Sequence, residues 1–412
     1  MAWRTLLAVV AAWCLTGAAD CTAAEPNEPS VRYLPLDAPA GMSQAVVVRG
    51  LPLAYTRQLV PVDREGKIVG AGSVEKQVEQ VLNTLDAVLN ASGSGLDQLV
   101  RLNVYAIAPS TVERVREQLA ARLEPSVRPA MTSVLTPMPH RGALVAVDAV
   151  AVAAEKRDTV ALTRVEAVAG HEDCADAAVL PPGGVAYLSG VPAEPGLTQS
   201  AVDKSMAGLC KTLDTLELTP AHVVRLKVFL RPASAADEVR RVLKKYFPGE
   251  LMPPVVFVEW LAGPPVEIEL VAQLPPTGES TPKVQHYDPP DVRPSQLFSR
   301  VALVRSERQI YTSSLFVKKP TGRRMEEALG VFDQLEAILA RAGSDLRHLA
   351  KGTYYVTDDG SAAGMDRVRL WRYDLATAPA ASKCMVHGVG EPERTMTLDM
   401  IAVESEQSRD DP

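Results

Sequence analysis

Leu96–Tyr105 reads LDQLVRLNVY, and two later stretches of the 412-residue chain resemble it. Pro220–Phe229 reads PAHVVRLKVF, and Leu346–Tyr355 reads LRHLAKGTYY. Each stretch ends in a run that predicts a strand. The stretches recur about every 125 residues, which is the length of a domain and not of a solenoid unit. The sequence therefore predicts three tandem copies of one domain.

The elements around each predicted strand recur in the same order. An amphipathic helix precedes it, and in the first copy one helical face carries Val74, Val78, Val81, Leu82, Leu85, Val88 and Leu89. A second, more charged helix is predicted at about 111–124, 234–247 and 364–376. An apolar strand closes each copy at 143–151, 265–272 and 395–402.

Each copy also begins with a hairpin-like segment, such as Ala45–Arg49 leading to Leu53–Arg57. The resulting order, β-β-α-β-α-β, predicts an α+β domain in which two helices cover one face of a sheet. Stretches rich in Pro, Gly and charge at about 152–160 and 274–282 read as linkers. The predicted domains accordingly span 30–153, 160–276 and 284–404.

Composition excludes several functions. The net charge is −7, so the chain has no overall electrostatic footprint for nucleic acid. The 5 cysteines include no CxxC pair, and the 6 histidines include no pair spaced i, i+4, so no metal site is expected. GxGxxG, P-loop and GxSxG motifs are absent, and we expect no cofactor. A disulfide between Cys174 and Cys210 and two free thiols are both consistent with the sequence.

The first residues predict a secretory signal peptide. Arg4 precedes a short apolar run, and Thr22–Ala24 has the small-x-small form of a cleavage site. An uncleaved anchor and a lipoprotein at Cys21 are the alternatives, but the run is short for a membrane span and Asp20 replaces a small residue. Cleavage after residue 24 predicts a periplasmic or secreted protein with no membrane association.

Several short segments resemble one family. Ser43–Val46 (SQAV) is similar to the end of a Gly-Pro-Tyr-Ser-Gln-Ala segment. Tyr55–Pro61 and Tyr187–Pro192 are similar to a Thr-Ser-Gly-Gln-Ile-Pro strand, and Val266–Ala272 (VEIELVA) to a closing Val-Glu-Ile-Glu-Ala-Ile-Ala strand. These segments are those of the RidA/YjgF family, the reactive-intermediate deaminases, and each copy resembles that family.

The resemblance implies a chorismate-mutase-like fold for each copy. Members of the family usually form homotrimers, with small-molecule sites in the clefts between neighbouring subunits. One chain that carries three copies then implies an intrachain pseudo-trimer. We therefore expect a monomer that binds a small-molecule ligand in the clefts between its copies.

The resemblance also implies site residues. In the family, an Arg of a Pro-Ala-Arg-Ser segment binds the substrate carboxylate, and the first Glu of the Glu-Ile-Glu segment orients the water that hydrolyses an imine or enamine. Glu267 matches this catalytic Glu, whereas Ala146 and Thr397 replace it in the other copies. The family's Ser-Gly strand assigns substrate contacts to Ser189, Gly190, Thr56 and Ser313.

No copy keeps the substrate-binding Arg. Met131, Val255 and Ser382 are the expected replacements, and Arg128 or Lys383 could supply the charge from nearby. The alternative is that both cations are solvated surface charges. Two functions remain open: an exported imine or enamine hydrolase with residual catalysis from Glu267, and a non-catalytic ligand-binding or scaffold protein.

Overall fold

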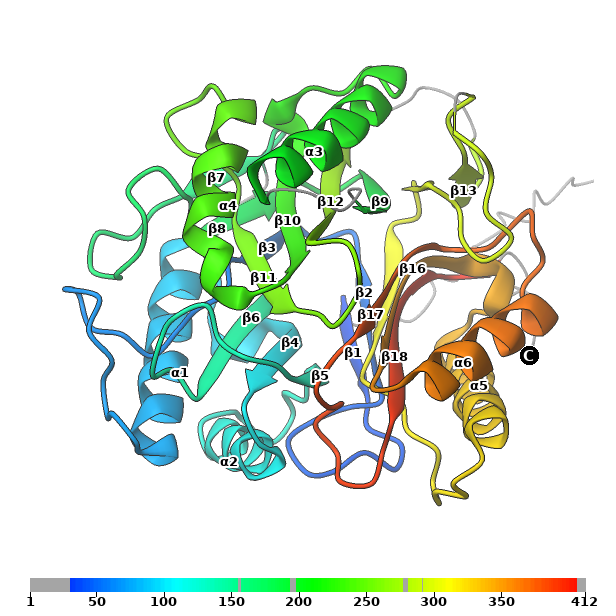
Figure 1. The fold of residues 1–412 in the computed structure, drawn as a ribbon, viewed down its shortest axis with the longest axis horizontal. Helices are drawn as coiled ribbons and strands as arrows, with labels where there is room; N and C mark the ends of the chain where they lie inside the picture. Colours follow the sequence, from blue (N-terminus) through cyan, green and yellow to red (C-terminus); the bar gives the residue numbers. More distant parts are fainter. Residues whose placement is uncertain (1–29, 155–156, 193–197, 277–280, 291, 406–412) are drawn as a thin grey trace, which may run out of the picture.

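The computed structural model describes residues 30–405 except 155–156, 193–197, 277–280 and 291. Its described part is an α+β structure with three six-stranded mixed sheets around a common centre (Figure 1). The expected fold class is thus confirmed. The predicted signal peptide lies outside the described residues. None of the described helices is long and apolar enough to cross a membrane.

Each of the three copies contains six strands and two α-helices, in the same order. The first copy consists of β1 (Val31–Leu34), β2 (Ala45–Arg49), β3 (Leu53–Thr56), α1 (Val74–Ala91), β4 (Leu99–Ala106), α2 (Pro109–Ala120), β5 (Ala130–Leu135) and β6 (Val145–Val152). The second consists of β7 (Ala161–Thr163), β8 (Ala177–Leu180), β9 (Gly184–Pro192), α3 (Thr198–Thr215), β10 (Val223–Leu230), α4 (Ala236–Leu243), β11 (Val255–Glu259) and β12 (Val266–Leu274). The third consists of β13 (Val284–Tyr287), β14 (Val301–Val304), β15 (Arg308–Thr312), α5 (Arg324–Ala342), β16 (Leu349–Val356), α6 (Asp359–Arg372), β17 (Ala380–Met385) and β18 (Met396–Val403).

Each copy thus has two strands more than the predicted order. One is a short leading strand (β1, β7 or β13), and the other is a strand that runs parallel to its neighbour after the second helix (β5, β11 or β17). α2 and α6 end at Ala120 and Arg372, before the predicted ends at about 124 and 376, whereas α4 continues as a 3-10 helix through Tyr246.

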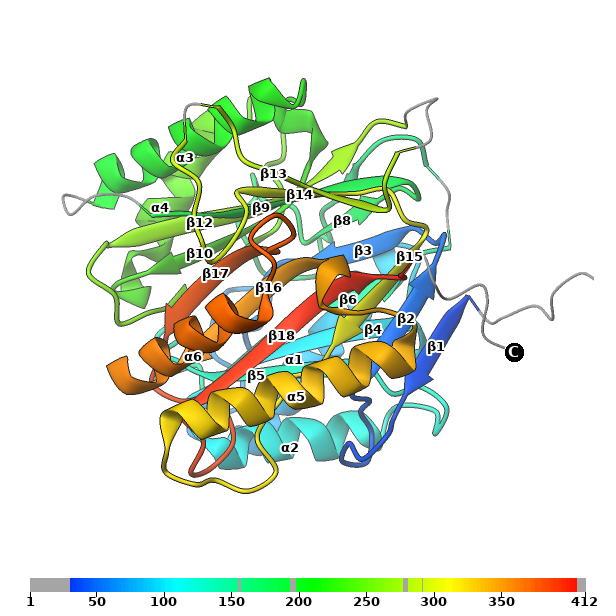
Figure 2. The ribbon, with the colours of Figure 1, turned by 90° about the vertical axis from the view of Figure 1, so that its right-hand side faces the viewer.

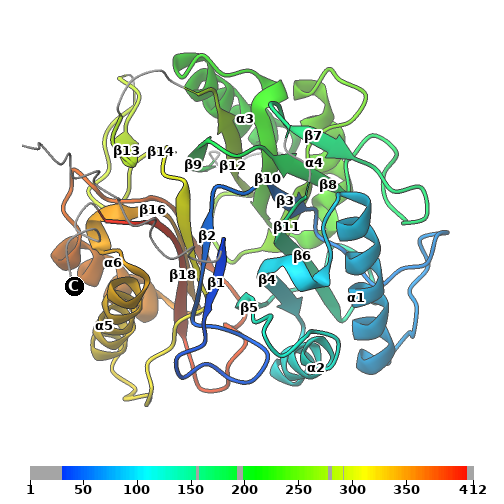
Figure 3. The same ribbon diagram turned by 180° about the vertical axis from the view of Figure 1, so that it is seen from behind.

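The sheets do not coincide with the copies, because each copy gives its first two strands to a neighbour. The strand orders are β1-β2-β15-β18-β16-β17, β5-β4-β6-β3-β8-β7 and β11-β10-β12-β9-β14-β13. The first copy's β1–β2 pair, seen from behind in Figure 3, therefore completes the sheet of the third copy, in which β15 lies between β2 and β18. Each copy gives its strands to the copy before it, and the first copy gives its strands to the third, so the exchange closes in a circle.

The expected hairpin of β2 and β3 is consequently wrong. Val48 pairs with Gln309 of β15, and Ala54 pairs with Val179 of β8. The short link at residues 50–52 carries the chain out of one sheet and into the next, as does the corresponding link between β8 and β9. The local sequence looks like a hairpin because it holds two short strands around a Gly-Leu-Pro turn.

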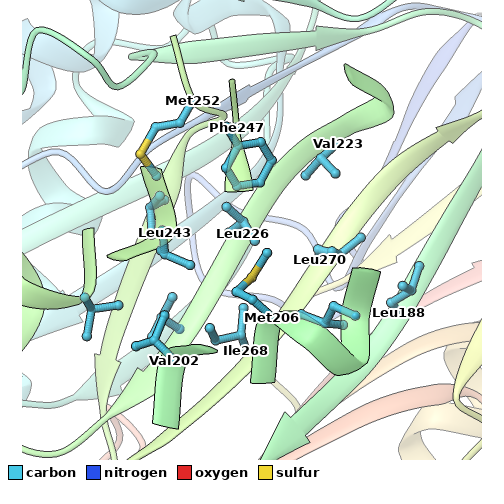
Figure 4. Packing of buried hydrophobic residues seen from close by; sticks show 14 of the residues in the cluster. Leu188, Val202, Met206, Val223, Leu226, Leu243, Phe247, Met252, Ile268 and Leu270 are labelled. Carbon is cyan, nitrogen blue, oxygen red and sulfur yellow. The ribbon is translucent and has the colours of Figure 1, made fainter. Parts of the chain in front are cut away.

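Helices cover the outer face of each sheet (Figure 2). The apolar stripe of each first helix packs on that face. Val78, Leu82, Leu85 and Leu89 of α1 are fully buried, as their spacing predicts. In the second copy, Val202 and Met206 of α3 pack over Ile268 of β12 and belong to one cluster with Leu226 and Leu243 (Figure 4). This packing fixes the position of each sheet relative to its helices.

The inner faces of the three sheets meet in a core that is polar at its centre. Three equivalent tyrosines, Tyr55, Tyr187 and Tyr311, are almost completely buried there. The hydroxyls of Tyr55 and Tyr311 are 3.2 Å apart, and both Tyr187 and Tyr311 donate to the side-chain oxygen of Gln309. The aromatic rings therefore lie inside the core with their polar ends satisfied.

Beside the tyrosines lies a ring of three ion pairs, and each pair joins two copies. Asp148 of β6 accepts from Arg225 of β10 at 2.9 Å, and Glu269 of β12 accepts from Lys351 of β16 at 2.5 Å. Asp399 of β18 closes the ring by pairing with Arg101 of β4. All six side chains come from equivalent positions of the copies, which gives the core its pseudo-threefold symmetry.

The closed exchange predicts that the protein is a monomer. Every sheet is completed by strands of the same chain, so a second chain has no exchanged strand to supply. Light scattering should give a mass near 44.2 kDa, that of one full chain. A mass near three times that value would show that chains exchange strands with one another.

Candidate functional site

Three equivalent boundaries, which we call clefts, lie where copies meet, and each combines the end of one copy's third strand with the parallel strand of the next. The first-second cleft joins β3 to β11, where the Gln58 N–H donates to the Val255 carbonyl at 3.1 Å. The second-third cleft joins β9 to β17, and the third-first cleft joins β15 to β5. In the latter, the Ser314 N–H donates to the Met131 carbonyl at 2.9 Å.

The strand register identifies which residues are equivalent. Met131 pairs with Leu102 and Val255 with Leu226, and the matching pair in the third copy is Ala381 with Gly352. Ala381, and not the expected Ser382, therefore stands at the position of the substrate-binding Arg. The sequence already contains this answer, because Pro379–Ser382 reads Pro-Ala-Ala-Ser and the third residue of that segment is Ala381.

The register also corrects the assignment of Thr56. Thr56 and Thr312 occupy the same position, and both hydroxyls accept from the closing strand, at the N–H groups of Ala149 (2.9 Å) and Met400 (2.8 Å). Thr56 is thus a buried link between strands, and Arg57 stands where the other copies have Ser189 and Ser313. One extra residue before Pro61 misled the sequence alignment.

Ser189 and Ser313 join copies together. The Ser189 hydroxyl donates to the Ser299 carbonyl at 2.6 Å and accepts from the Ala381 N–H at 2.7 Å. Ser313 makes the same two contacts, with the Ser43 carbonyl and the Met131 N–H. Both hydroxyls are buried and use their hydrogen for the backbone, so they shape the clefts and have no hydrogen left to donate to a substrate.

The second-third cleft brings together Glu267, Gly190 and Ser382. Glu267 is 8% exposed on β12, and its carboxylate lies so close to Gly190 that a Cβ there would be 1.9 Å from Oε1. Burial, followed by the negative charge of Glu269, raises the pKa of Glu267 to about 7, against the opposing effects of the Ser382 hydroxyl, Lys351 and Arg300. A carboxyl with such a pKa exchanges a proton near neutral pH.

Neither proposed substitute cation is free in the described part of the structure. Lys383 lies in the second-third cleft, but its ammonium pairs with Asp366 of α6. Arg128 donates through Nε to the Pro125 carbonyl of its own turn at 3.1 Å. Lys383 does lie on β17, and Arg128 lies just before β5. Their partners come from α6 and from the turn before β5, which the sequence alone did not indicate.

Arg300 is the cation that the sequence reasoning missed. It precedes β14, and its guanidinium lies 5.0 Å above the Phe298 ring while its Nε is buried without an acceptor among the described residues. Its charge also lowers the pKa of Glu267, which places the two in one electrostatic environment. The strand register shows that Arg300 occupies the same position in the third copy as Gln44 of the SQAV segment in the first copy. Because the residue type differs, the sequence alone gave only an indirect signal for Arg300.

The first-second cleft contains a cavity of about 250 Å³ in which both arginines are already paired. Arg57 donates to Asp176 at 2.7 Å. Arg240 pairs with Asp237 at 2.5 Å and stacks over the Phe257 ring. Because these charges are neutralised, the cavity presents paired ions beside apolar walls.

The third-first cleft contains a second cavity, of about 220 Å³, with a mixed lining. Met42, Met131, Phe316 and Val317 form its apolar part, and its polar residues include Gln44, Ser133, Ser314, Gln334 and Arg394. At the rim, Arg116 pairs with Glu391 at 2.9 Å, and Lys318 pairs with Asp37 at 2.8 Å. Glu267 lines neither this cavity nor that of the first-second cleft.

No group of three or more His, Cys, Asp or Glu side chains that could hold a metal is found among the described residues. Cys174 and Cys210 are both free thiols, so the disulfide alternative is wrong for this structure. Cys384 is also free and fully buried, and burial raises the pKa of its thiol well above its usual range. These thiols therefore pack in the interior.

Comparison with known proteins yields a family. The model of a family described as Endoribonuclease L-PSP matches residues 35–153. Protein DfrA of Myxococcus xanthus is 32% identical over 110 residues, which are 27% of this chain and 83% of that protein.

Single-copy structures match as well. A YjgF-family protein from Neisseria meningitidis is 23% identical, with a TM-score of 0.23 over 24% of this chain and 81% of its own. A Rid-family protein from Yersinia pestis is 22% identical, with a TM-score of 0.26 over 30% and 98%. A putative endoribonuclease from Thermotoga maritima is 29% identical, with a TM-score of 0.23 over 30% and 98%.

The fold and its clefts define a three-copy α+β protein with sites between copies. The chain belongs to the RidA/YjgF family, as its sequence motifs predicted.

The raised pKa of Glu267 predicts a pH-dependent stability. Between its ordinary value of 4.5 and about 7, the folded state keeps a proton that the unfolded state has lost, so stability falls as the pH rises through this window. Glu267→Gln removes this dependence and should become more stable than the native protein by about 3 kcal/mol above pH 7. Urea unfolding at pH 5 and pH 8 measures the difference, and an equal effect of the substitution at both values would contradict the assignment.

Proposed function

We propose that the second-third cleft is the catalytic cleft of the chain and hydrolyses small imines or enamines to carbonyl compounds and ammonia. The observation that supports this most is Glu267, a buried carboxyl with a pKa of about 7. It lies against Gly190 of its own copy and close to Ser382 of the next. This arrangement suits a group that must take and return a proton at neutral pH.

The chemistry needs one proton acceptor and one water molecule. The Glu267 carboxylate takes a proton from water as the water oxygen bonds to the imine carbon, and the C=N electrons pass to nitrogen, which takes that proton back from Glu267 to give a neutral carbinolamine. Glu267 then takes the proton of the carbinolamine hydroxyl as the carbonyl group forms, and delivers it to the leaving nitrogen. Ammonia departs with both protons of the water, and Glu267 is again a carboxylate. An enamine enters the same route after protonation at carbon.

Arg300 takes the role of the missing substrate-binding Arg in this proposal. Its guanidinium has no carboxylate partner among the described residues and lies on the Phe298 ring. Stacking leaves its N–H edge available for a carboxylate. The contact comes from a different strand than the family's Arg, so we expect a weaker substrate orientation and slower hydrolysis than in an ordinary member.

The other two clefts favour a second function, the binding of a ligand without hydrolysis. They have cavities of about 250 and 220 Å³, but Ala146 and Thr397 replace the catalytic Glu, and the Thr397 hydroxyl donates to the Leu315 carbonyl. Met131 in the third-first cleft also gives an apolar surface where a carboxylate would need a cation. We propose that these clefts hold apolar or neutral groups.

An assay with an imine of a small 2-oxo acid, such as 2-iminobutanoate, tests the proposal through ammonia release. Glu267→Gln keeps the shape but removes the base and should lower the rate about 10²-fold or more. Arg300→Met should raise KM and lower kcat/KM about 30-fold or more, because a charge-assisted contact is lost. Arg128→Met, a matched removal of a cation that holds its own turn, should leave the rate unchanged.

The outcome decides between the two functions. Ammonia release that is insensitive to Glu267→Gln contradicts the catalytic role. No release above the buffer rate leaves ligand binding as the function of all three clefts.

A further inference from the structure

We propose that the centre of the molecule holds a monatomic anion, such as chloride, between the three copies. The site is a cavity of about 30 Å³ on the pseudo-threefold axis. Its lining includes four cationic side chains, Arg101, Arg225, Lys227 and Lys351. This site is separate from the clefts and does not depend on the proposed hydrolysis.

The charges around this cavity do not balance. Arg101, Arg225 and Lys351 are each paired with a carboxylate of the ring, so these three pairs are neutral together. Lys227 is the fourth cation, and no described carboxylate forms an ion pair with it. The equivalent residues of the other copies, Asn103 and Thr353, are uncharged. The second copy alone therefore brings one surplus positive charge into the core while the carboxyl of Glu267, which stands where the other copies have Ala146 and Thr397, is protonated.

The contacts of Lys227 do not neutralise it. Its ammonium donates to the Tyr355 hydroxyl at 2.6 Å and lies 5.3 and 5.4 Å from the ring centres of Tyr355 and Phe229. Burial raises the pKa of Tyr355 well above its usual range, so this partner is a neutral phenol. Burial lowers the pKa of Lys227, and the carboxylates of Glu269, Asp399 and Asp148, each already paired with another cation, oppose this only in part. A buried charge without a partner of its own is costly, and an anion in the neighbouring cavity would offset that cost.

The cavity also contains a donor without a partner. Arg101 is 6% exposed, and its Nε finds no acceptor among the described residues, although its Nη2 contacts both Asp399 and Thr132. A water molecule could accept this N–H, but only an anion would also balance the charge. Arg101 and Lys227 thus supply two independent reasons for the same occupant.

Size restricts the anion to a small one. A volume of about 30 Å³ accommodates one or two water-sized particles, so a halide fits and a sulfate or phosphate with its four oxygens does not. The charges of Lys227, Glu267 and Glu269 all act on Cys384, which places the carboxyl of Glu267 in the same electrostatic environment as Lys227. The anion should bind best below pH 7, where the carboxyl of Glu267 is protonated and adds no negative charge.

Thermal unfolding at pH 6 tests the site. With ionic strength held constant, replacing gluconate by chloride should raise the midpoint of the full chain by about 2 °C or more. Lys227→Thr introduces the residue that the third copy has at this position and should abolish the chloride effect. Arg323→Gln removes an exposed cation and should retain it.

Crystals grown in bromide provide a second measurement that does not depend on a variant. An anomalous peak on the axis, among Arg101, Arg225 and Lys227, is the expected result. Equal midpoints in chloride and gluconate, together with no such peak, would overturn the proposal and leave water as the occupant. If Lys227→Thr does not fold, the bromide map decides alone.

Discussion

Alternating charges at the centre of the molecule hold the three copies together. Each carboxylate of the ring reaches across a boundary to the cation of the next copy, and each is almost fully buried. Removing six charges from water is expensive, and the expense is offset only if every partner stays in place. Asp148 shows how completely this is done, since Asn103, Tyr105 and Arg225 all donate to it. The ring thereby favours one arrangement of the copies.

The strand exchange also holds the three copies in one arrangement, through backbone hydrogen bonds. Since every sheet takes two strands from another copy, no copy can complete its own sheet. Ser189 and Ser313 reinforce two of the boundaries through paired hydrogen bonds. In the first-second boundary the equivalent residue is Arg57, which binds Asp176 instead. The first-second cleft therefore has an arginine–aspartate pair at the position where the other two clefts have a serine bonded to the backbone of the neighbouring copy.

Much of the fold could be predicted from sequence, because its repeats preserve apolar spacing that any copy of the domain requires. The apolar face of α1 and the three closing strands were correct for this reason. The exchange of strands could not be predicted, since β2 pairs equally well with β3 or with β15 on local pattern alone. The ion-pair ring left a signal that was overlooked, in the recurrence of Arg101, Arg225 and Lys351 within the repeated stretch.

Site prediction was less complete, because a cleft depends on residues that are distant in sequence. Glu267 and Gly190 do meet, as the family resemblance implied. Thr56 was misplaced by one inserted residue, and Arg300 was missed because it reaches the cleft from another strand. The divergence of the clefts follows from the three copies lying in one chain, where each can change without altering the others.

Calorimetry of Asp399→Asn tests the interlocked ring most directly. The substitution leaves the buried Arg101 without its carboxylate and should cost about 3–5 kcal/mol. Because the copies are joined by both the ring and the exchanged strands, we expect the native chain to unfold in one transition and the variant to unfold in one transition at a lower temperature. Asp37→Asn, which removes an exposed carboxylate, should shift the transition little. Separate transitions for the copies, of which only one responds to Asp399→Asn, would contradict this account.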